Sequence, residues 1–168
     1  MVMPFLPQEI LQPVQELIYK SCLFMNDEAW KDYLSICDPQ SFRYRVLNYS
    51  PEIRKEQVWA DRDYSSMKLS FDLLPRHNSD HSKLTRQVNI YSVDYDEQTK
   101  EANVVSALTI YRTQLDGTMS YIESGQTSLY AVGLYKDRIR FNGGSPKLVD
   151  RIVQLDTRQL DVGTHKPF

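Results

Sequence analysis

The three histidines of the sequence are the first residues to test for metal or proton-transfer chemistry. His77 and His81 are four residues apart, a spacing that on a helix places two metal ligands on one face. They flank Asn-Ser-Asp directly after a proline, however, and we expect a polar loop with little to pack over Pro75–Lys83. His165 lies in the C-terminal segment Gly-Thr-His-Lys-Pro-Phe. Helical spacing therefore does not apply, and we predict no metal ligand in this chain.

Motifs for nucleophilic catalysis and phosphate binding are also missing from the sequence. Ser124 stands beside Gly125, but its surroundings lack the Gly-x-Ser-x-Gly pattern of a nucleophile elbow. The glycines of Asn-Gly-Gly-Ser-Pro are followed by no helix that could hold a phosphate, so this segment is read as a turn. We predict no catalytic and no cofactor-binding residue in this chain.

One alternative keeps an enzymatic function open. A cone-shaped α+β domain can hold a deep pocket in which an inward Asp and an inward His or Tyr transfer protons. Tyr44, Asp63 and Arg112 could line such a pocket here. The chain would then be a free-standing dehydratase- or isomerase-type enzyme, or a module that binds a small ligand. No histidine falls on an inward strand position, which disfavours this alternative.

Length and composition indicate one soluble domain. The 168 residues fit a single domain over 1–168, with an N-terminal extension at 1–12 and a C-terminal tail at 157–168. A net charge of −2 provides no basic field for nucleic acid. Cys22 and Cys37 fall on apolar helix faces, which predicts buried reduced thiols rather than a disulfide.

The start of the sequence and its hydropathy predict a cytoplasmic protein. Met-Val-Met-Pro-Phe has no basic start and no long apolar run, as a signal peptide would. No apolar run approaches the ~20 residues that a helix needs to cross a bilayer. We expect neither a membrane nor a nucleic acid as partner.

Helical periodicity dominates the first part of the chain. A first helix is expected from Pro13, and the residues of its buried stripe are Val14, Leu17, Ile18, Ser21, Cys22 and Met25. Asn26 or Asp27 should cap a second helix, with the stripe Trp30, Tyr33, Leu34 and Cys37. A third helix is expected from about Asp63, with the stripe Tyr64, Met67, Phe71 and Leu74.

Alternating patterns predict strands in the remainder. The segment Ser41–Tyr49 alternates, and a short extended piece follows from Val58. After the polar loop we expect strands at about Leu84–Tyr95, Ala102–Thr113, Met119–Lys136 and Lys147–Asp156. Helices followed by a run of strands predict an α+β domain, a cone in which a strongly curved antiparallel sheet wraps the N-terminal helices.

The last of these strands has two mixed faces. Val149, Arg151, Val153 and Leu155 share one face, and Leu148, Asp150, Ile152 and Gln154 share the other. A surface strand normally alternates apolar inside with polar outside. This pattern indicates a strand that is covered on both sides.

Four segments, in order, carry a family resemblance: LIYKSCLFMNDEAWKDYLSICDPQSFRYRV, LTRQVNIYSVD, NVVSALTIYRT and GGSPKLVDRIVQLD. From about Tyr19 to Phe168 the chain resembles the small (beta) subunits of Rieske-type aromatic-ring-hydroxylating oxygenases. It departs from the family where Pro146–Leu148 replace a frequent Trp. The segment FRYRVLNYSPEIRKEQVWADRDYSSM resembles subunits of enzymes for aromatic carboxylates, such as terephthalate dioxygenase and salicylate hydroxylases, more than monooxygenases of small sulfonates.

The resemblance implies a cystatin-like cone of the nuclear transport factor 2 superfamily and a structural role. It implies three small and three large subunits in a hexamer, with the Rieske [2Fe-2S] cluster and the mononuclear non-haem iron in the large subunit. A reductase or ferredoxin would deliver electrons from NADH to the large subunit. The assembled enzyme would oxygenate an aromatic compound, and this chain would hold no cofactor of its own.

The resemblance also suggests what covers the mixed strand, namely its own core on one side and a neighbouring subunit on the other. Interfaces of this kind retain paired charges that set register. Arg151 and Asp156 are the first candidates for subunit-interface residues, followed by Arg86 and Arg112. An arginine suits this role because its planar fork binds a carboxylate with two hydrogen bonds.

Overall fold

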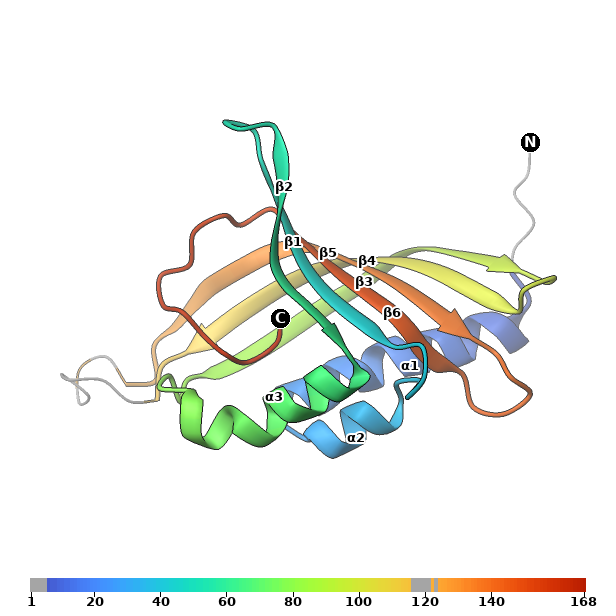
Figure 1. Cartoon of the computed structure of the whole chain (residues 1–168), viewed down its shortest axis with the longest axis horizontal. Coiled ribbons are helices and arrows are strands. Elements are labelled where there is room, and N and C mark those ends of the chain that lie inside the picture. Colours follow the sequence, from blue (N-terminus) through green and yellow to red (C-terminus); the bar gives the residue numbers. More distant parts are fainter. Residues whose placement is uncertain (1–5, 116–121, 123) are drawn as a thin grey trace.

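The structure is a computed structural model that describes residues 6–115, 122 and 124–168. Its elements follow the order α1, α2, β1, β2, α3, β3, β4, β5, β6. The helices lie on the open side of a strongly curved sheet (Figure 1). This confirms the predicted α+β class and the predicted curvature.

The helices are α1 (Gln8–Asn26), α2 (Trp30–Ser35) and α3 (Tyr64–His77). The buried residues of α1 are the six of its predicted stripe, which confirms the 3.6-residue period as the signal. The predicted start was wrong, because α1 begins before Pro13 and contains it. A proline removes only its own N–H from the helical ladder, and packing of the stripe offsets that loss.

The predicted caps of the second helix were also wrong. Asn26 ends α1, and its side chain exchanges two hydrogen bonds with the backbone of Arg86 in β3. Ala29 precedes α2 and makes no side-chain cap. Asn26 thus ties the end of a helix to the sheet. The helix α3, by contrast, begins where it was expected. Asp63 caps it, because its carboxylate accepts a hydrogen bond from the Ser66 N–H at 2.7 Å.

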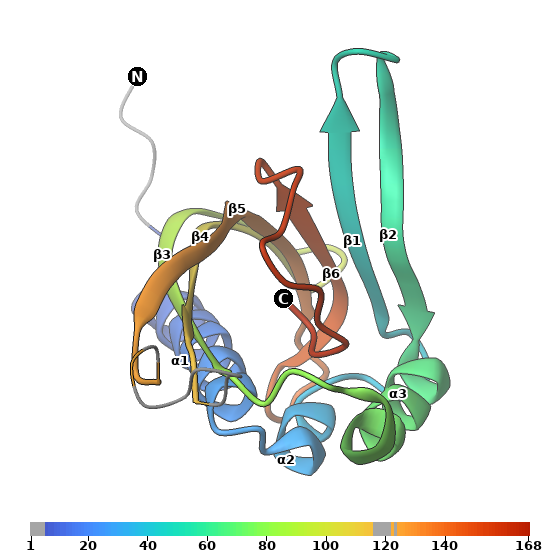
Figure 2. The same ribbon diagram turned by 90° about the vertical axis from the view of Figure 1, so that its left-hand side faces the viewer.

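The sheet has six strands in the order β2-β1-β6-β5-β4-β3. Their bounds are β1 (Arg43–Ser50), β2 (Lys55–Asp63), β3 (Lys83–Asp96), β4 (Glu101–Thr113), β5 (Thr127–Arg140) and β6 (Lys147–Leu155). Neighbouring strands in it pair antiparallel, except that β1 and β6 run parallel. The sheet curls round until its concave side faces the helices, and the β1–β2 hairpin extends beyond it (Figure 2). The strand β6 therefore lies inside the sheet, with β1 on one side and β5 on the other.

The core fills the space between the concave face and the helices. In β4 every second residue faces inward and is buried, namely Ala102, Val104, Ser106, Leu108 and Ile110. The residues between them on the convex face are partly or fully exposed, as the period of two requires. Cys22 and Cys37 are buried and free, as predicted.

Two boundaries and one loop differ from expectation. The strand predicted at Met119–Lys136 begins at Thr127 and ends at Arg140, and residues 119–121 lie outside the described ones. The helix α3 continues through Pro75 to His77. The rest of the predicted loop is packed at Asn78 and Ser82, which are buried beneath the C-terminal tail, residues 157–168, whereas Ser79 and His81 are exposed. No helix in the described ranges is long and apolar enough to cross a membrane.

Gly133 in β5 lies very close to the backbone of the neighbouring strand β6. A Cβ atom at this position would lie 2.2 Å from the carbonyl oxygen of Gln154 in β6. Because that obstacle is backbone, Gly133→Ala should lower the free energy of unfolding by about 1–3 kcal/mol. Gly144→Ala is the matched control, since nothing lies within 4 Å of its added Cβ. Urea unfolding measures both, and equal midpoints for the two variants would contradict the contact.

Candidate functional site

The interior of the cone is where an enzyme of this shape would hold its reacting groups, and here it contains a buried ion pair. Arg151 in β6 and Asp137 in β5 stand opposite each other in the strand register. The guanidinium donates from Nε and Nη2 to the two carboxylate oxygens at 2.7 and 2.8 Å. Both side chains are 0% exposed. The geometry is the two-bond fork that makes an arginine–carboxylate pair strong and directional.

Ser21 and Tyr135 also contact the guanidinium of Arg151. The hydroxyl oxygen of Ser21 in α1 accepts a hydrogen bond from Nη2 at 2.9 Å. The ring of Tyr135 lies 4.1 Å from Cζ, within cation–π range. Burial alone would lower the pKa of Arg151, but the charge of Asp137 outweighs it and raises that pKa well above the usual value. Burial raises the pKa of Asp137, while the charge and the hydrogen bonds of Arg151 act to lower it. The pair joins α1 to the two central strands.

The C-terminal tail closes the wide end of the cone. The hydroxyl of Tyr44 donates to the carbonyl of Phe168 and accepts from its N–H at 2.9 Å. Arg86 donates to the carbonyl of Pro167. The ring of Phe168 stacks on Tyr130 with centroids 6.2 Å apart. Figure 2 shows the tail crossing the opening of the curved sheet. The chain's own residues thus occupy the interior.

The residues of the alternative acid–base pocket do not come together. Tyr44 is buried and bonded to the tail, and its pKa is raised to about 12 because burial disfavours the phenolate. Asp63 caps α3 at the exposed surface. Arg112 binds Asp80, with donor–acceptor distances of 3.1 Å from Nε and Nη2. The three side chains share no cavity.

The histidines are split between two places. His77, at the end of α3, and His165, in the tail, line one pocket. His81 is exposed in the segment between α3 and β3. Within residues 6–115, 122 and 124–168, no group of three or more His, Cys, Asp or Glu side chains is arranged to hold a metal ion.

The four interface candidates have different environments. Arg151 is satisfied inside its own chain by Asp137, so the idea that it pairs across an interface is replaced by an intrachain role. Arg86 is buried and bonds Asn26 and the carbonyls of Leu84 and Pro167. Arg112 is about nine-tenths buried against Asp80. Asp156 is exposed just beyond β6 and stays a prediction as an interface residue.

The exposed surface offers one prominent apolar feature, the β1–β2 hairpin. Its strands project from the body of the molecule (Figures 1 and 2), and β2 is an edge strand. Tyr49, Ile53 and Val58 on this hairpin are 51%, 56% and 60% exposed. Neighbouring apolar side chains on a projecting edge are typical of surfaces that another chain covers.

Comparison with curated proteins yields two relatives that align over almost the whole chain. The beta subunit of the methanesulfonate monooxygenase hydroxylase of Methylosulfonomonas methylovora is 33% identical over 98% of this chain and 91% of the relative. The beta subunit of 2-aminobenzenesulfonate 2,3-dioxygenase of an Alcaligenes species is 28% identical over 92% of this chain and 97% of its own. The chain belongs to the family of oxygenase beta subunits. No family model matches the sequence.

Solved structures agree on the fold of this beta subunit. Naphthalene 1,2-dioxygenase gives a TM-score of 0.74 at 16% identity, over 98% of this chain and 86% of that one. A protein of Nostoc punctiforme with a cystatin-like fold gives 0.58 at 13% identity, over 92% and 97%. A protein of Novosphingobium aromaticivorans described as a scytalone dehydratase gives 0.61 at 12% identity, over 94% and 92%. The cystatin-like cone is confirmed, and it is shared by proteins of more than one function.

Sequence reasoning missed Asp137 and the tail. Asp137 lies between Lys136 and Arg138, so the local sequence resembles a run of exposed charged residues. Its place opposite Arg151 follows only from the pairing of β5 with β6. Tyr135 and Ile139 were the available signal, because a strand period of two places Asp137 between them on the same buried face.

Removing one partner of the buried pair should destabilise the beta subunit itself. Arg151→Met leaves the carboxylate of Asp137 buried without a counter-charge, so the free energy of unfolding should fall by about 3–5 kcal/mol. The double variant Arg151→Met/Asp137→Leu should recover most of this loss. Arg43→Met, which breaks the exposed pair with Asp61, is the control and should cost about 0–1 kcal/mol. A double variant as unstable as the single one, in denaturant unfolding, would contradict a paired-charge role.

The Asp80–Arg112 pair should give an acid-dependent contribution to stability. Partial burial raises the pKa of Asp80, but hydrogen bonds from Arg112 and Ser82 outweigh it and lower the pKa to about 2. The unfolded value is about 3.9, so the contribution is complete above about pH 4 and is lost as pH falls through 2. The stability difference between the native chain and Asp80→Asn should shrink over that window. In an Arg112→Met background the shrinkage should largely disappear, and an unchanged pH profile there would argue against the pair as its cause.

Proposed function

We propose that this beta subunit is the non-catalytic structural subunit of the terminal oxygenase of a multicomponent Rieske non-haem iron hydroxylase. The observation that carries the proposal is its interior. Where a cone-fold enzyme needs an open pocket, this chain has a fully buried Arg151–Asp137 pair and a tail bound to Tyr44 and Arg86. The near full-length match to an oxygenase beta subunit supports the same role.

The proposed assembly contains three beta subunits and three large subunits. The Rieske [2Fe-2S] cluster and the mononuclear iron would reside in the large subunit, and a reductase or ferredoxin would supply it with electrons from NADH. The complex would act in the cytoplasm. The contribution of this chain is geometric, since a rigid cone can hold large subunits in fixed relative positions.

We propose an organic acid as the substrate of the complex, bound in the large subunit. The sequence favours an aromatic carboxylate, whereas the two curated relatives are named for methanesulfonate and 2-aminobenzenesulfonate. Carboxylate and sulfonate share a compact anionic head. An organic acid with such a head matches the names of both relatives, although methanesulfonate has no aromatic ring.

The β1–β2 hairpin is the part of the beta subunit that we propose as a subunit contact. Its apolar side chains Ile53 and Val58 are more than half exposed in the isolated chain. Obligate interfaces bury such groups and resemble a core cut in two. Asp156, which is exposed beside the end of β6, remains a candidate for a charged contact at the interface.

A gentle tagged purification from the native host tests the assembly. The tagged beta subunit should return with a partner about two to three times its mass, in a brown complex that contains iron. Native mass spectrometry and the visible absorption spectrum measure both properties. A colourless chain that is recovered alone would contradict the proposal and would return attention to the pocket-enzyme alternative.

A surface variant sharpens the same experiment. Ile53→Ser/Val58→Ser should fold normally, because both side chains are exposed, yet should be recovered without most of the large subunit. Leu69→Ser on α3, at 59% exposure, is the matched control and should leave the complex intact. Full recovery of the large subunit with the hairpin variant would exclude the hairpin as a main contact.

A further inference from the structure

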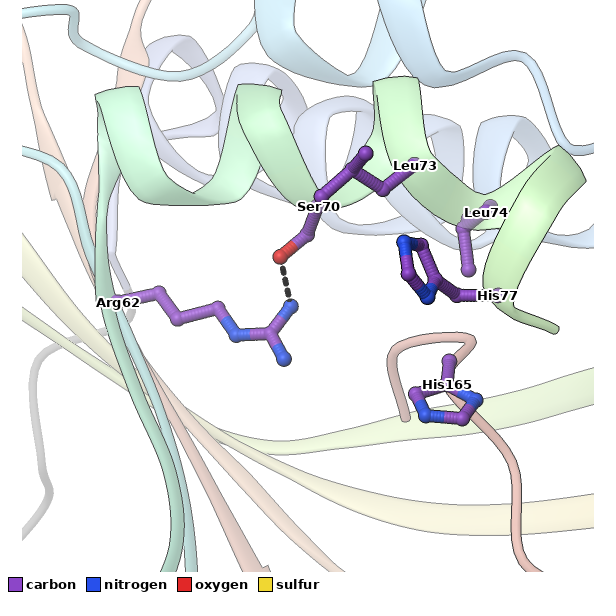
Figure 3. A pocket seen from close by; sticks show the side chains of 6 residues that line it. All are labelled: Arg62, Ser70, Leu73, Leu74, His77 and His165. Atoms are coloured by element: carbon purple, nitrogen blue, oxygen red, sulfur yellow. Dashed lines mark hydrogen bonds between the residues drawn. The ribbon is translucent and has the colours of Figure 1, made fainter.

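A cleft that contains one arginine, Arg62, without an ion-pair partner among the described residues lies between the β1–β2 hairpin, α3 and the C-terminal tail, and the structural role does not use it. Its inner part is a pocket of about 210 Å³ lined by Arg62, Ser70, Leu73, Leu74, His77 and His165. Figure 3 shows the guanidinium of Arg62 directed at Ser70 on α3, with the imidazoles of His77 and His165 near each other across the pocket. These polar groups come from three separate segments of the chain and converge on one space.

The charge of Arg62 is not neutralised within the chain. Its guanidinium donates to the neutral hydroxyl of Ser70, and among the described residues no carboxylate lies within ion-pair distance of it. Its acidic neighbours along β2 are engaged elsewhere. Asp61 binds Arg43, and Asp63 caps α3. Since a guanidinium has five N–H donors, Arg62 retains donors that can bind an anion in the pocket.

A second hollow adjoins the first and has an aromatic lining. Its volume is about 320 Å³, and its lining includes Arg62 and His165, which it shares with the first, together with Tyr44, Trp59 and Phe168. Trp59 is the extra residue of a bulge, because Val46 and Leu47 of β1 pair with Ala60 and Val58 on either side of it. The bulge aims the indole toward the tail, where its ring centroid is 6.4 Å from that of Phe168.

The basic group on the far side of this hollow is already paired. Lys166 is 7% exposed, and its ammonium group contacts Glu28 and the carbonyl of Ser82. Among the described residues that line the two hollows, Arg62 is therefore the basic side chain without a carboxylate at ion-pair distance, and it lies at the junction of the polar pocket and the aromatic hollow. An occupant that matches this layout carries one anionic head beside a flat apolar body.

We infer that this cleft binds a single-ring aromatic acid, with its carboxylate or sulfonate at Arg62, Ser70, His77 and His165 and its ring against Trp59. An arginine fork binds the two oxygens of such a head with parallel hydrogen bonds. An indole face provides a large stacking surface for the ring. The volume of the aromatic hollow is near the lower end of small-molecule sites, roughly 300–1,000 Å³, which suits one ring. The site belongs to the beta subunit alone and is independent of the proposed assembly.

A fluorescence titration of the purified chain tests the inference. Trp30→Phe leaves Trp59 as the remaining tryptophan of the two in the sequence, so its emission reports on the cleft. Benzenesulfonate and benzoate should change this emission saturably. Benzyl alcohol, which has the ring without the charge, and inorganic sulfate, which has the charge without the ring, should each bind at least tenfold more weakly. Equal binding of benzyl alcohol would overturn the inference.

Further variants, made in the Trp30→Phe background, locate the binding site of the acid's anionic head group. Arg62→Gln should weaken benzenesulfonate binding at least tenfold, and Arg62→Lys should have an intermediate effect because it keeps the charge and loses the fork. His165→Gln, an exposed position in the tail, should weaken binding severalfold and provides a reading if the Arg62 variants fold poorly. Arg54→Gln is the matched control on the same hairpin and should bind normally. Unchanged affinity in both Arg62→Gln and His165→Gln would overturn the site.

One further experiment decides whether the cleft binds a free acid or an acidic side chain of the large subunit. The tagged Arg62→Gln variant is purified as the complex, and its recovery of the large subunit is measured. Normal recovery together with lost binding of benzenesulfonate supports a small-molecule site. Lost recovery, with no binding of free acids by the native chain, would overturn the inference and assign the cleft to a subunit contact. Because the titration uses the beta subunit alone, failure of the assembly proposal would not affect it.

Discussion

The pairing of Arg151 with Asp137 is the constraint on which the interior of this beta subunit depends. Moving an isolated arginine or aspartate out of water carries a penalty of several kcal/mol, and the attraction between the two repays it only when the geometry is good. Here the strand register supplies that geometry, because β5 and β6 place the two residues directly opposite each other. The bond to Ser21 then requires α1 to lie at one position over the sheet. Register, helix position and charge compensation are thus mutually dependent.

The same pair explains a strand whose two faces both mix apolar and polar residues. The parallel contact with β1 and the antiparallel contact with β5 satisfy both backbone edges of β6. Its inner face can then carry Arg151, because Nε and Nη2 of the guanidinium donate to Asp137 and Ser21. On its outer face Asp150 binds Arg45 at 2.7 Å, and Ile152 remains partly exposed. A neighbouring subunit is therefore not needed to explain Arg151.

The local elements were predictable because their signals are local. The buried stripe of α1 follows from a period of 3.6 residues and was predicted correctly. The alternation of β1 was predicted correctly through Val46, after which a bulge interrupts it and Leu47 and Asn48 are both buried. What could not be predicted depends on contacts between distant segments. The parallel pairing of β1 with β6 joins residues about a hundred positions apart, and no local pattern encodes its register. The tail belongs to this class, and the partner of Asp137 likewise follows only from the pairing of β5 with β6.

The tail shows why a shared cone does not imply a shared activity. In this fold a pocket enzyme and a structural subunit differ in what fills the interior, rather than in the strands themselves. Here the backbone of residues 167 and 168 binds Arg86 and Tyr44, two buried polar groups that an open cone would offer to water or to a ligand. The tail that closes the interior also forms a wall of the cleft at Arg62, through His165. The tail therefore covers Arg86 and Tyr44 inside the cone and contributes His165 to the cleft. A ligand can reach His165 and Arg62 there without entering the core.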